Sequence, residues 1–216
     1  MARPIGETDG AMPWPDPIDG PLPESSRRMM EAAVDAFAER GYHATTTRDI
    51  ATRVGLSPAA LYVHFPSKQA LLTEISRQGH EAAVELVATS MVGIGDPLGR
   101  LQAVVHAFAA WHAEHHQVAR VVQAELSALA DDDRRAVIAL RQKIERQVQS
   151  QLEAGTSNGQ MQVDEPRAVA RALLSLCVDV SRWYDPKSSE TPEGIGRLYA
   201  DLATRMVQPA GVALRP

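Results

Sequence analysis

The sequence has little of what exported, membrane-spanning or nucleic-acid-coating proteins need. Its 216 residues include one cysteine, Cys177, which cannot form an internal disulfide and therefore favours a reducing compartment. There is no run of about eighteen apolar residues and no charged-then-apolar signal at the N-terminus, so we expect no membrane partner and a cytoplasmic location. Asp and Glu number 27 against 22 Lys and Arg, which excludes a protein that coats nucleic acid through bulk positive charge.

Aromatic residues are also scarce, at 5% of the chain, while Ala, Leu, Val and Arg are abundant. Apolar side chains recur every three or four residues through most of the sequence, and no segment alternates as a strand would. The apolar content of 44% and the charged content of 23% are those of a globular protein, so wholesale disorder is excluded. The sequence therefore predicts an all-α fold.

The two ends of the chain differ from the rest. Residues 1–23 hold six prolines and three glycines, and one arginine faces four acidic residues. Trp14 is the only large aromatic side chain in this segment. Such a segment cannot offset its ordering entropy by burying apolar groups, so we predict a disordered acidic arm. Residues 209–216 are expected to form a short tail.

Three helices with clear end signals are predicted after the arm. Apolar residues at helical spacing predict the first over 25–40. Thr46 and Asp49 form a Thr-x-x-Asp capping pattern at the start of the second. Ser57 is suited to cap the third, with Pro58 as its first residue, where a missing N–H costs nothing. Two short helices joined by a Gly-Leu-Ser turn have the spacing of a helix-turn-helix.

The longer run from Phe37 to Leu72 is more specific than the turn alone. It has the residue types that one class of helix-turn-helix domain shares at fixed positions. These residues are Phe37, Gly41, Thr47, Ile50, Ala51, Gly55, Leu61, Tyr62, Phe65 and Lys68. Over about residues 26–75, without a gap, the sequence resembles the DNA-binding domain of the TetR family of bacterial repressors.

The resemblance implies a DNA-binding domain over 24–70, with its motif at about 46–65, and a helical regulatory and dimerisation domain over 71–208. It implies a ligand-responsive regulator, most simply a repressor, that binds a palindromic operator in double-stranded DNA as a homodimer. A small apolar effector would release it, and no cofactor is implied. Two alternatives stay open: an activator of the same fold, and a helical structural protein that does not bind DNA.

The third predicted helix would be the recognition helix. At 100° per residue, Leu61 and Phe65 face the core, which leaves Val63 and its neighbours free to contact thymine methyls. That helix has no Arg, Lys, Asn or Gln, so Arg48 in the preceding helix is the candidate for a guanine contact, or alternatively a phosphate clamp. The resemblance places Tyr62 and His64 at the phosphate walls. The predicted DNA contacts are Thr46, Thr47, Arg48, Ser57, Pro58, Ala59, Ala60, Tyr62, Val63, His64 and Lys68.

The helix N-termini supply the remaining phosphate contacts in this prediction. Thr46 and Thr47 stand where free backbone N–H groups and the helix dipole favour an anion. Lys68, at the start of a fourth helix, is expected to be a second phosphate anchor. Taken one at a time, each of these residues is equally compatible with an ordinary surface position.

The second part of the chain is predicted to be helical throughout. The expected helices cover about 68–88, 97 to beyond 111, 117–130, 134–154, 166–184 and 192 onward. By resemblance, the last two form a four-helix bundle between two subunits. The predicted dimer contacts are Val169, Leu173, Leu176, Cys177, Val180, Ile195, Leu198, Tyr199, Leu202 and Met206. Core stripes inside one subunit would have the same spacing.

A ligand pocket is expected between the middle helices. The candidate lining residues are Val105, Phe108, Trp111, Val122, Leu126, Ile138, Leu176, Val180 and Trp183, of which about one in three is expected to touch a ligand. The stretch 180–184 followed by Pro186 resembles regulators of lipid or steroid breakdown that respond to acyl-CoA thioesters. The sequence departs from that group at Asp185 and at 187–189. Arg182 is a candidate for a phosphate contact or, alternatively, a surface salt bridge.

Neither a metal site nor an active site is predicted. His112 and His116 are four residues apart, but no further ligand stands at reliable spacing. No nucleophile–base pair or phosphate loop is present, so we do not expect an enzyme. Cys177 lies on an apolar stripe, where a thiol is inert packing.

The charge balance has a different meaning when it is resolved along the chain. Residues 40–77 contain five basic and two acidic residues, so this part of the predicted DNA-binding domain, here called the reading head, carries a net charge of +3. The acidic arm alone accounts for −3 of the total of −5. We therefore expect selective binding to DNA with modest non-specific affinity.

Overall fold

The computed structural model describes residues 23–208, and these form an all-helical chain without strands. Its elements are α1 (Glu24–Arg40), α2 (Thr47–Arg53), α3 (Pro58–His64), α4 (Lys68–Ser90), α5 (Pro97–Glu114), α6 (His116–Ala124), the 3-10 helix η1 (Leu126–Ala128), α7 (Asp131–Ser157), α8 (Pro166–Trp183) and α9 (Pro192–Val207). The predicted all-α fold is confirmed. The expectations for the arm and for the tail at 209–216 lie outside the described residues, apart from Pro23.

The predicted helix starts are confirmed where a side chain caps them. The Thr46 hydroxyl accepts a hydrogen bond from the Asp49 backbone N–H at 3.1 Å, and the Asp49 carboxylate accepts one from the Thr46 N–H at 2.9 Å. Ser57 caps α3, with Pro58 at its first position. These caps satisfy backbone donors that have no partner within the helix, which is why local sequence is enough to place them.

Two helix boundaries differ from the prediction. The segment expected as one helix over 117–130 is divided, because α6 ends at Ala124 and η1 follows as a separate turn. At this break the Glu125 carboxylate accepts a hydrogen bond from the Tyr42 backbone N–H at 3.3 Å. The next helix, α7, begins at Asp131 itself, so the acidic triplet occupies its first turn, where the helix dipole stabilises negative charge.

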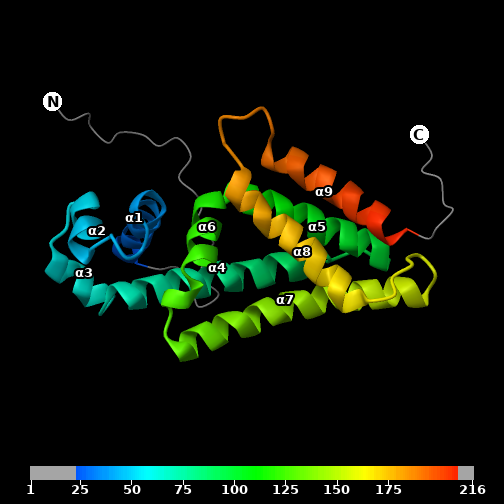
Figure 1. The fold of residues 1–216 in the computed structure, drawn as a ribbon, viewed down its shortest axis with the longest axis horizontal. Coiled ribbons are helices and arrows are strands. Elements are labelled where there is room, and N and C mark those ends of the chain that lie inside the picture. Colours follow the sequence, from blue (N-terminus) through cyan, green and yellow to red (C-terminus); the bar gives the residue numbers. More distant parts are fainter. Residues whose placement is uncertain (1–22, 209–216) are drawn as a thin grey trace.

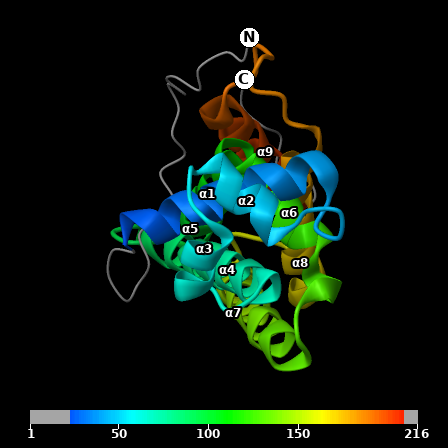
Figure 2. The ribbon, with the colours of Figure 1, turned by 90° about the vertical axis from the view of Figure 1, so that its left-hand side faces the viewer.

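Two clusters of buried apolar side chains hold the helices together. The first joins α1, α2, α3 and the first half of α4 with α6 and the start of α7. The second joins the other half of α4 with α5, α7, α8 and α9. Figure 1 shows α1–α3 grouped at the left-hand end, with α4 running from them to the right, above α7 in this view. Figure 2, turned by 90°, shows the same three helices in front of the rest. Because α4 contributes to both clusters, it connects the two parts of the chain.

The contact between α5 and α9 is a close approach of two backbones. A Cβ atom at Gly196 would lie 2.7 Å from the His106 carbonyl oxygen and 3.2 Å from the Ala110 Cβ. Glycine therefore allows α9 to lie directly against α5. The His106 imidazole and the Glu193 carboxylate, 3.1 Å apart, join the same two helices at the surface. This packing fixes which face of α9 points outward.

Within residues 23–208, no helix combines the length and the apolar character needed to cross a bilayer.

Candidate nucleic-acid interface and ligand cavity

The short helix α3 presents a small, apolar face to solvent. Leu61 and Phe65 are buried, as their spacing predicts. On the other side, the Val63 side chain is 81% exposed and that of Tyr62 is 51% exposed, while Ala59 is also exposed. An exposed valine beside an exposed tyrosine on a helix capped by serine suits insertion into a groove wide enough for a helix.

Hydrogen bonds fix the orientation of α3 against α1 and α2. Both ring nitrogens of His64 contact serine hydroxyls at the start of α1, at 3.2 Å for Ser25 and 3.0 Å for Ser26. The Tyr62 hydroxyl lies 3.1 Å from that of Thr47 in α2. The sequence indicated exposed polar residues here but not these partners. The phosphate contacts expected of Tyr62 and His64 stay predictions, and the structure gives both residues a positioning role.

Most of the positive charge near α2 is already paired. Arg40 lies 3.8 Å from the Asp49 carboxylate, and Arg53 forms a salt bridge with Glu39. Asp49 is also hydrogen-bonded by Thr46, which lowers the pKa of its carboxyl. In the described part of α2 and α3, Arg48 is the exposed arginine that makes no ion pair. Its guanidinium is therefore available to another molecule.

Lys68 differs from the expectation of a free phosphate anchor. Its ammonium donates hydrogen bonds to the carbonyl oxygens of Tyr42 and Thr45, at 2.6 and 2.7 Å. It also lies 4.2 Å from the centroid of the Tyr42 ring, within the range of a cation–π interaction. The ammonium thus ties the start of α4 to the turn between α1 and α2, and two of its three donors are already used.

A cavity of about 450 Å³ lies among α4, α5, α6, α7 and α8. This volume is typical of small-molecule sites. Its lining residues are Gly79, His80, Ala83, Phe108, Trp111, His112, Val122, Gln123, Arg141, Ile144, Glu145, Arg171, Leu174, Ser175, Val178 and Asp179. Aliphatic and aromatic side chains form the apolar part of the lining, and the charged side chains come from α7 and α8.

Three of the nine predicted pocket residues, Phe108, Trp111 and Val122, line this cavity, and six do not. Val105 and Val180 are buried in the second apolar cluster, and Leu126 packs against the first. Ile138, Leu176 and Trp183 are exposed on the outer faces of α7 and α8. Helical spacing gave an apolar stripe in each case but did not show which way the stripe faces.

The cavity also contains a buried polar chain that sequence reasoning missed. The His80 Nδ1–H donates to the Ser76 carbonyl oxygen at 2.7 Å, and His80 Nε2 accepts a hydrogen bond from Arg141 Nε at 2.9 Å. Burial lowers the pKa of His80 to about 4, so its imidazole is neutral at physiological pH. Burial also lowers the pKa of Arg141. These two residues are 61 positions apart, and no local pattern connects them.

His112 hydrogen-bonds within α5, and His116 hydrogen-bonds back across the break between α5 and α6. Nδ1 of His112 donates a hydrogen bond to the Phe108 carbonyl oxygen at 2.7 Å. Nδ1 of His116 lies 2.9 Å from the Ala113 carbonyl oxygen. Burial lowers the pKa of His112 to about 4. No group of three His, Cys, Asp or Glu that could hold a metal ion is found among residues 23–208.

The residues predicted for a dimer interface divide into two groups. Leu173, Cys177, Val180 and Ile195 are buried within the subunit, and Val169 and Tyr199 pack partly against them. A second group is 43% to 52% exposed, namely Leu176, Leu198, Leu202 and Met206. The predicted set spans both groups, because the inner and outer faces of α8 and α9 are both apolar. The dimer contacts themselves stay a prediction.

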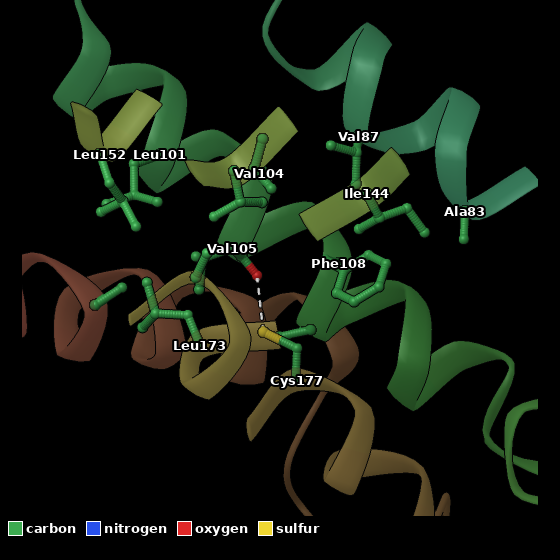
Figure 3. Packing of buried hydrophobic residues seen from close by; sticks show 14 of the residues in the cluster. Ala83, Val87, Leu101, Val104, Val105, Phe108, Ile144, Leu152, Leu173 and Cys177 are labelled. Atoms are coloured by element: carbon green, nitrogen blue, oxygen red, sulfur yellow. Dashed lines mark hydrogen bonds between the residues drawn. The ribbon is translucent and has the colours of Figure 1, made fainter. Parts of the chain in front are cut away.

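Cys177 is part of the inner group. Its thiol lies 3.9 Å from the Val105 carbonyl oxygen, and Figure 3 shows it directed at that atom between α5 and α8. Burial raises the pKa of the thiol to about 12, so it stays protonated. Cys177 therefore acts as a packing residue here.

Comparison with known proteins gives matches over both parts of the chain. Residues 29–75 match the family described as bacterial regulatory proteins, tetR family, and residues 95–207 match the tetracyclin repressor-like C-terminal domain. The chain is similar to the HTH-type transcriptional repressor KstR2 of Rhodococcus jostii (strain RHA1), with 32% identity over 197 residues, 87% of this chain and 94% of the relative.

Two solved structures extend this comparison. One is a bacterial regulatory protein in the tetR family from Rhodococcus RHA1, at 34% identity and a TM-score of 0.82, over 88% of this chain and 100% of that one. The other is AibR in complex with isovaleryl coenzyme A and operator DNA. It shares the fold at 23% identity and a TM-score of 0.75, over 86% of this chain and 99% of that one.

Proposed function

Since this chain belongs to the TetR family of bacterial regulatory proteins, we propose that it is a transcriptional repressor that binds a palindromic operator as a homodimer and is released by a small molecule. One observation carries the proposal: the exposed apolar face of α3 and Arg48, which makes no ion pair, occur together at the same end of the molecule. An apolar helix face reads thymine methyls, and a free guanidinium binds guanine or phosphate.

The exposed apolar faces of α8 and α9 support a dimer. Leu198, Leu202 and Met206 are spaced by four residues on α9, and Leu176 and Trp183 are spaced by seven on α8, so each set lies on one side of its helix. All five are large, apolar and between 41% and 52% exposed. A second copy would cover this patch and supply the second reading head that a palindrome requires.

The position of the cavity supports regulation by a ligand. Gly79, His80 and Ala83 line the cavity from α4, the same helix whose first residue, Lys68, holds the turn before α2. A ligand that displaces α4 would therefore displace the reading head. Coupling of this kind requires two distinct sites and one element that both sites bias, and α4 fits that description.

The proposal is tested by selecting genomic fragments that the full-length protein binds, followed by gel-shift titrations on the selected sequence. We expect a palindromic site and binding that weakens as salt is raised. Arg48→Ala should weaken binding to the selected site by about tenfold or more and flatten the preference at one base pair. Arg146→Ala, an exposed arginine on α7, is the matched control.

Three outcomes decide between the alternatives. No selected fragment would contradict DNA binding and favour a structural or interaction protein. Equal weakening on all sequences by Arg48→Ala would make that residue a backbone contact only. A reporter gene placed behind the selected site should be expressed more strongly when the regulator is deleted; weaker expression would identify an activator instead.

A further inference from the structure

Arg141 is a cation without a counterion inside the ligand cavity. Its Nε donates to a neutral imidazole, that of His80, which orients the guanidinium but supplies no negative charge. Its Nη2 is buried and has no hydrogen-bond partner among residues 23–208. Buried charge that is neither paired nor fully hydrogen-bonded is unfavourable, and such groups are concentrated at binding sites.

The two carboxylates that line the same cavity are committed to other arginines. Glu145, one helical turn beyond Arg141, pairs with Arg167 at 2.8 Å and with Arg171 at 3.0 Å. Asp179 pairs with Arg182 at 2.7 Å. Arg171 lines the cavity too, but its charge is shared with Glu145 at an exposed position. Arg141 therefore stands out as the half-buried arginine of the lining that lacks an acidic partner.

The surroundings of Arg141 determine what kind of molecule could neutralise it. Ala83, Phe108, Trp111 and Ile144 form an apolar wall in the same cavity. A free inorganic anion would leave that wall in contact with water, and a purely apolar molecule would leave the buried Nη2 unpaired. A molecule that carries both an apolar body and a negatively charged oxygen group satisfies both parts of the lining.

We propose that the effector is an apolar molecule bearing an oxyanion, either a carboxylate or a phosphate, and that Arg141 binds this oxyanion within the cavity. The inference rests on the proposed function, because it describes the ligand of the cavity that would control DNA binding. His80 is a positioning residue in this arrangement: its Nε2 holds Arg141 Nε, which leaves the other nitrogens of the guanidinium for the ligand.

The test compares two fluorescent probes of the same aromatic body on the full-length protein. One is 8-anilinonaphthalene-1-sulfonate, and the other is N-phenyl-1-naphthylamine, which lacks the sulfonate. We expect the wild type to bind the sulfonate about tenfold to hundredfold more tightly, the range of one charge-assisted hydrogen-bonded contact. Arg141→Gln should bring the two affinities within about threefold, and Arg141→Lys should keep part of the preference.

Arg135→Gln provides the matched control, because Arg135 is an exposed residue of the same helix and lies outside the cavity lining. Thermal melting of each variant establishes that it is folded. Equal affinity for the two probes in the wild type overturns the proposal. A preference that survives in folded Arg141→Gln, or no binding of either probe, also overturns it.

A second measurement separates the two sources of the oxyanion. Decanoate, decanol and decanoyl-coenzyme A are each used to displace the bound sulfonate probe from the wild type. Stronger displacement by decanoate than by decanol identifies a carboxylate, and stronger displacement by the coenzyme A thioester alone identifies a phosphate. Equal displacement by decanol overturns the proposal. Operator binding by unliganded wild type is measured separately, so failure of the proposed function is seen without reference to these ligands.

Discussion

The buried imidazole of His112 makes the stability of the protein depend on pH in a defined direction. His112 is nearly inaccessible, donates to the Phe108 carbonyl oxygen, and stacks edge-on against the Phe108 and Trp111 rings, at centroid distances of 4.4 and 5.0 Å. Burial lowers its pKa from 6.5 to about 4. Between these two values the unfolded chain binds a proton that the folded chain does not.

The free energy of unfolding therefore falls as pH falls from about 6.5 towards 4, and the full contribution is present above about 6.5. A shift of this size corresponds to about 3 kcal/mol over the whole range, and to about 1 kcal/mol between pH 6 and pH 5. His80, whose pKa is lowered to a similar value, adds an effect of the same sign. A comparison of variants is needed to isolate one imidazole.

The perturbation is His112→Gln, which retains a side-chain hydrogen-bond donor but does not titrate. Urea denaturation at fixed protein concentration, from pH 7.5 to pH 5, gives the free energy of unfolding of each protein. We expect the wild type to lose about 1 kcal/mol more than His112→Gln between pH 6 and pH 5. His43→Gln, at an exposed position, is the control and should follow the wild type. Parallel curves for wild type and His112→Gln would refute the reasoning.

Three further predictions concern the helix packing, the caps and the outer face. Gly196→Ala places a methyl group 2.7 Å from the His106 carbonyl oxygen, so urea denaturation should show a loss of about 1–3 kcal/mol in stability; an unchanged midpoint would mean that α9 can move away freely. Thr46→Ala removes the cap of α2 and should lower stability by about 1 kcal/mol, measured in the same way, and no loss would contradict the capping role. Leu202→Asp should shift the protein from dimer to monomer in analytical ultracentrifugation, whereas Val92→Asp, at an exposed apolar position outside α8 and α9, should not. A dimer that persists in Leu202→Asp would exclude this face.

Those parts of the fold that depend on neighbouring residues could be predicted from the sequence. The Thr46 and Ser57 caps, the proline starts of α3, α5, α8 and α9, and the buried pair Leu61 and Phe65 follow from interactions within one helical turn. The break between α6 and η1 could not, because it coincides with a contact from Glu125 to a turn 83 residues away.

The candidate site shows the same division. Phe108 and Trp111 do line the cavity, because an aromatic pair on one helical face tends to point inward, and their contact with a ligand stays a prediction. Leu176 and Trp183, seven residues apart, also share one face of α8 but point outward, since the direction of a stripe is set by which helices pack beside it. Arg141 and His80 were missed because each is an unremarkable polar residue in its own helix and acquires a role only where α4 and α7 meet.

Because Lys68 is hydrogen-bonded to the turn before α2, a small tilt of α4 at the cavity would be transmitted, and enlarged, at the start of the helix. Twelve residues separate His80 at the cavity from Lys68, which is about 18 Å of helix at 1.5 Å per residue. A tilt of about 5° about the cavity would move the far end by about 1.6 Å, and the two carbonyl contacts of Lys68 would carry α2 and α3 with it. Hydrogen bonds to base edges tolerate only a few tenths of an ångström, so under the proposed function a movement too small to alter the fold would be large enough to break the base contacts.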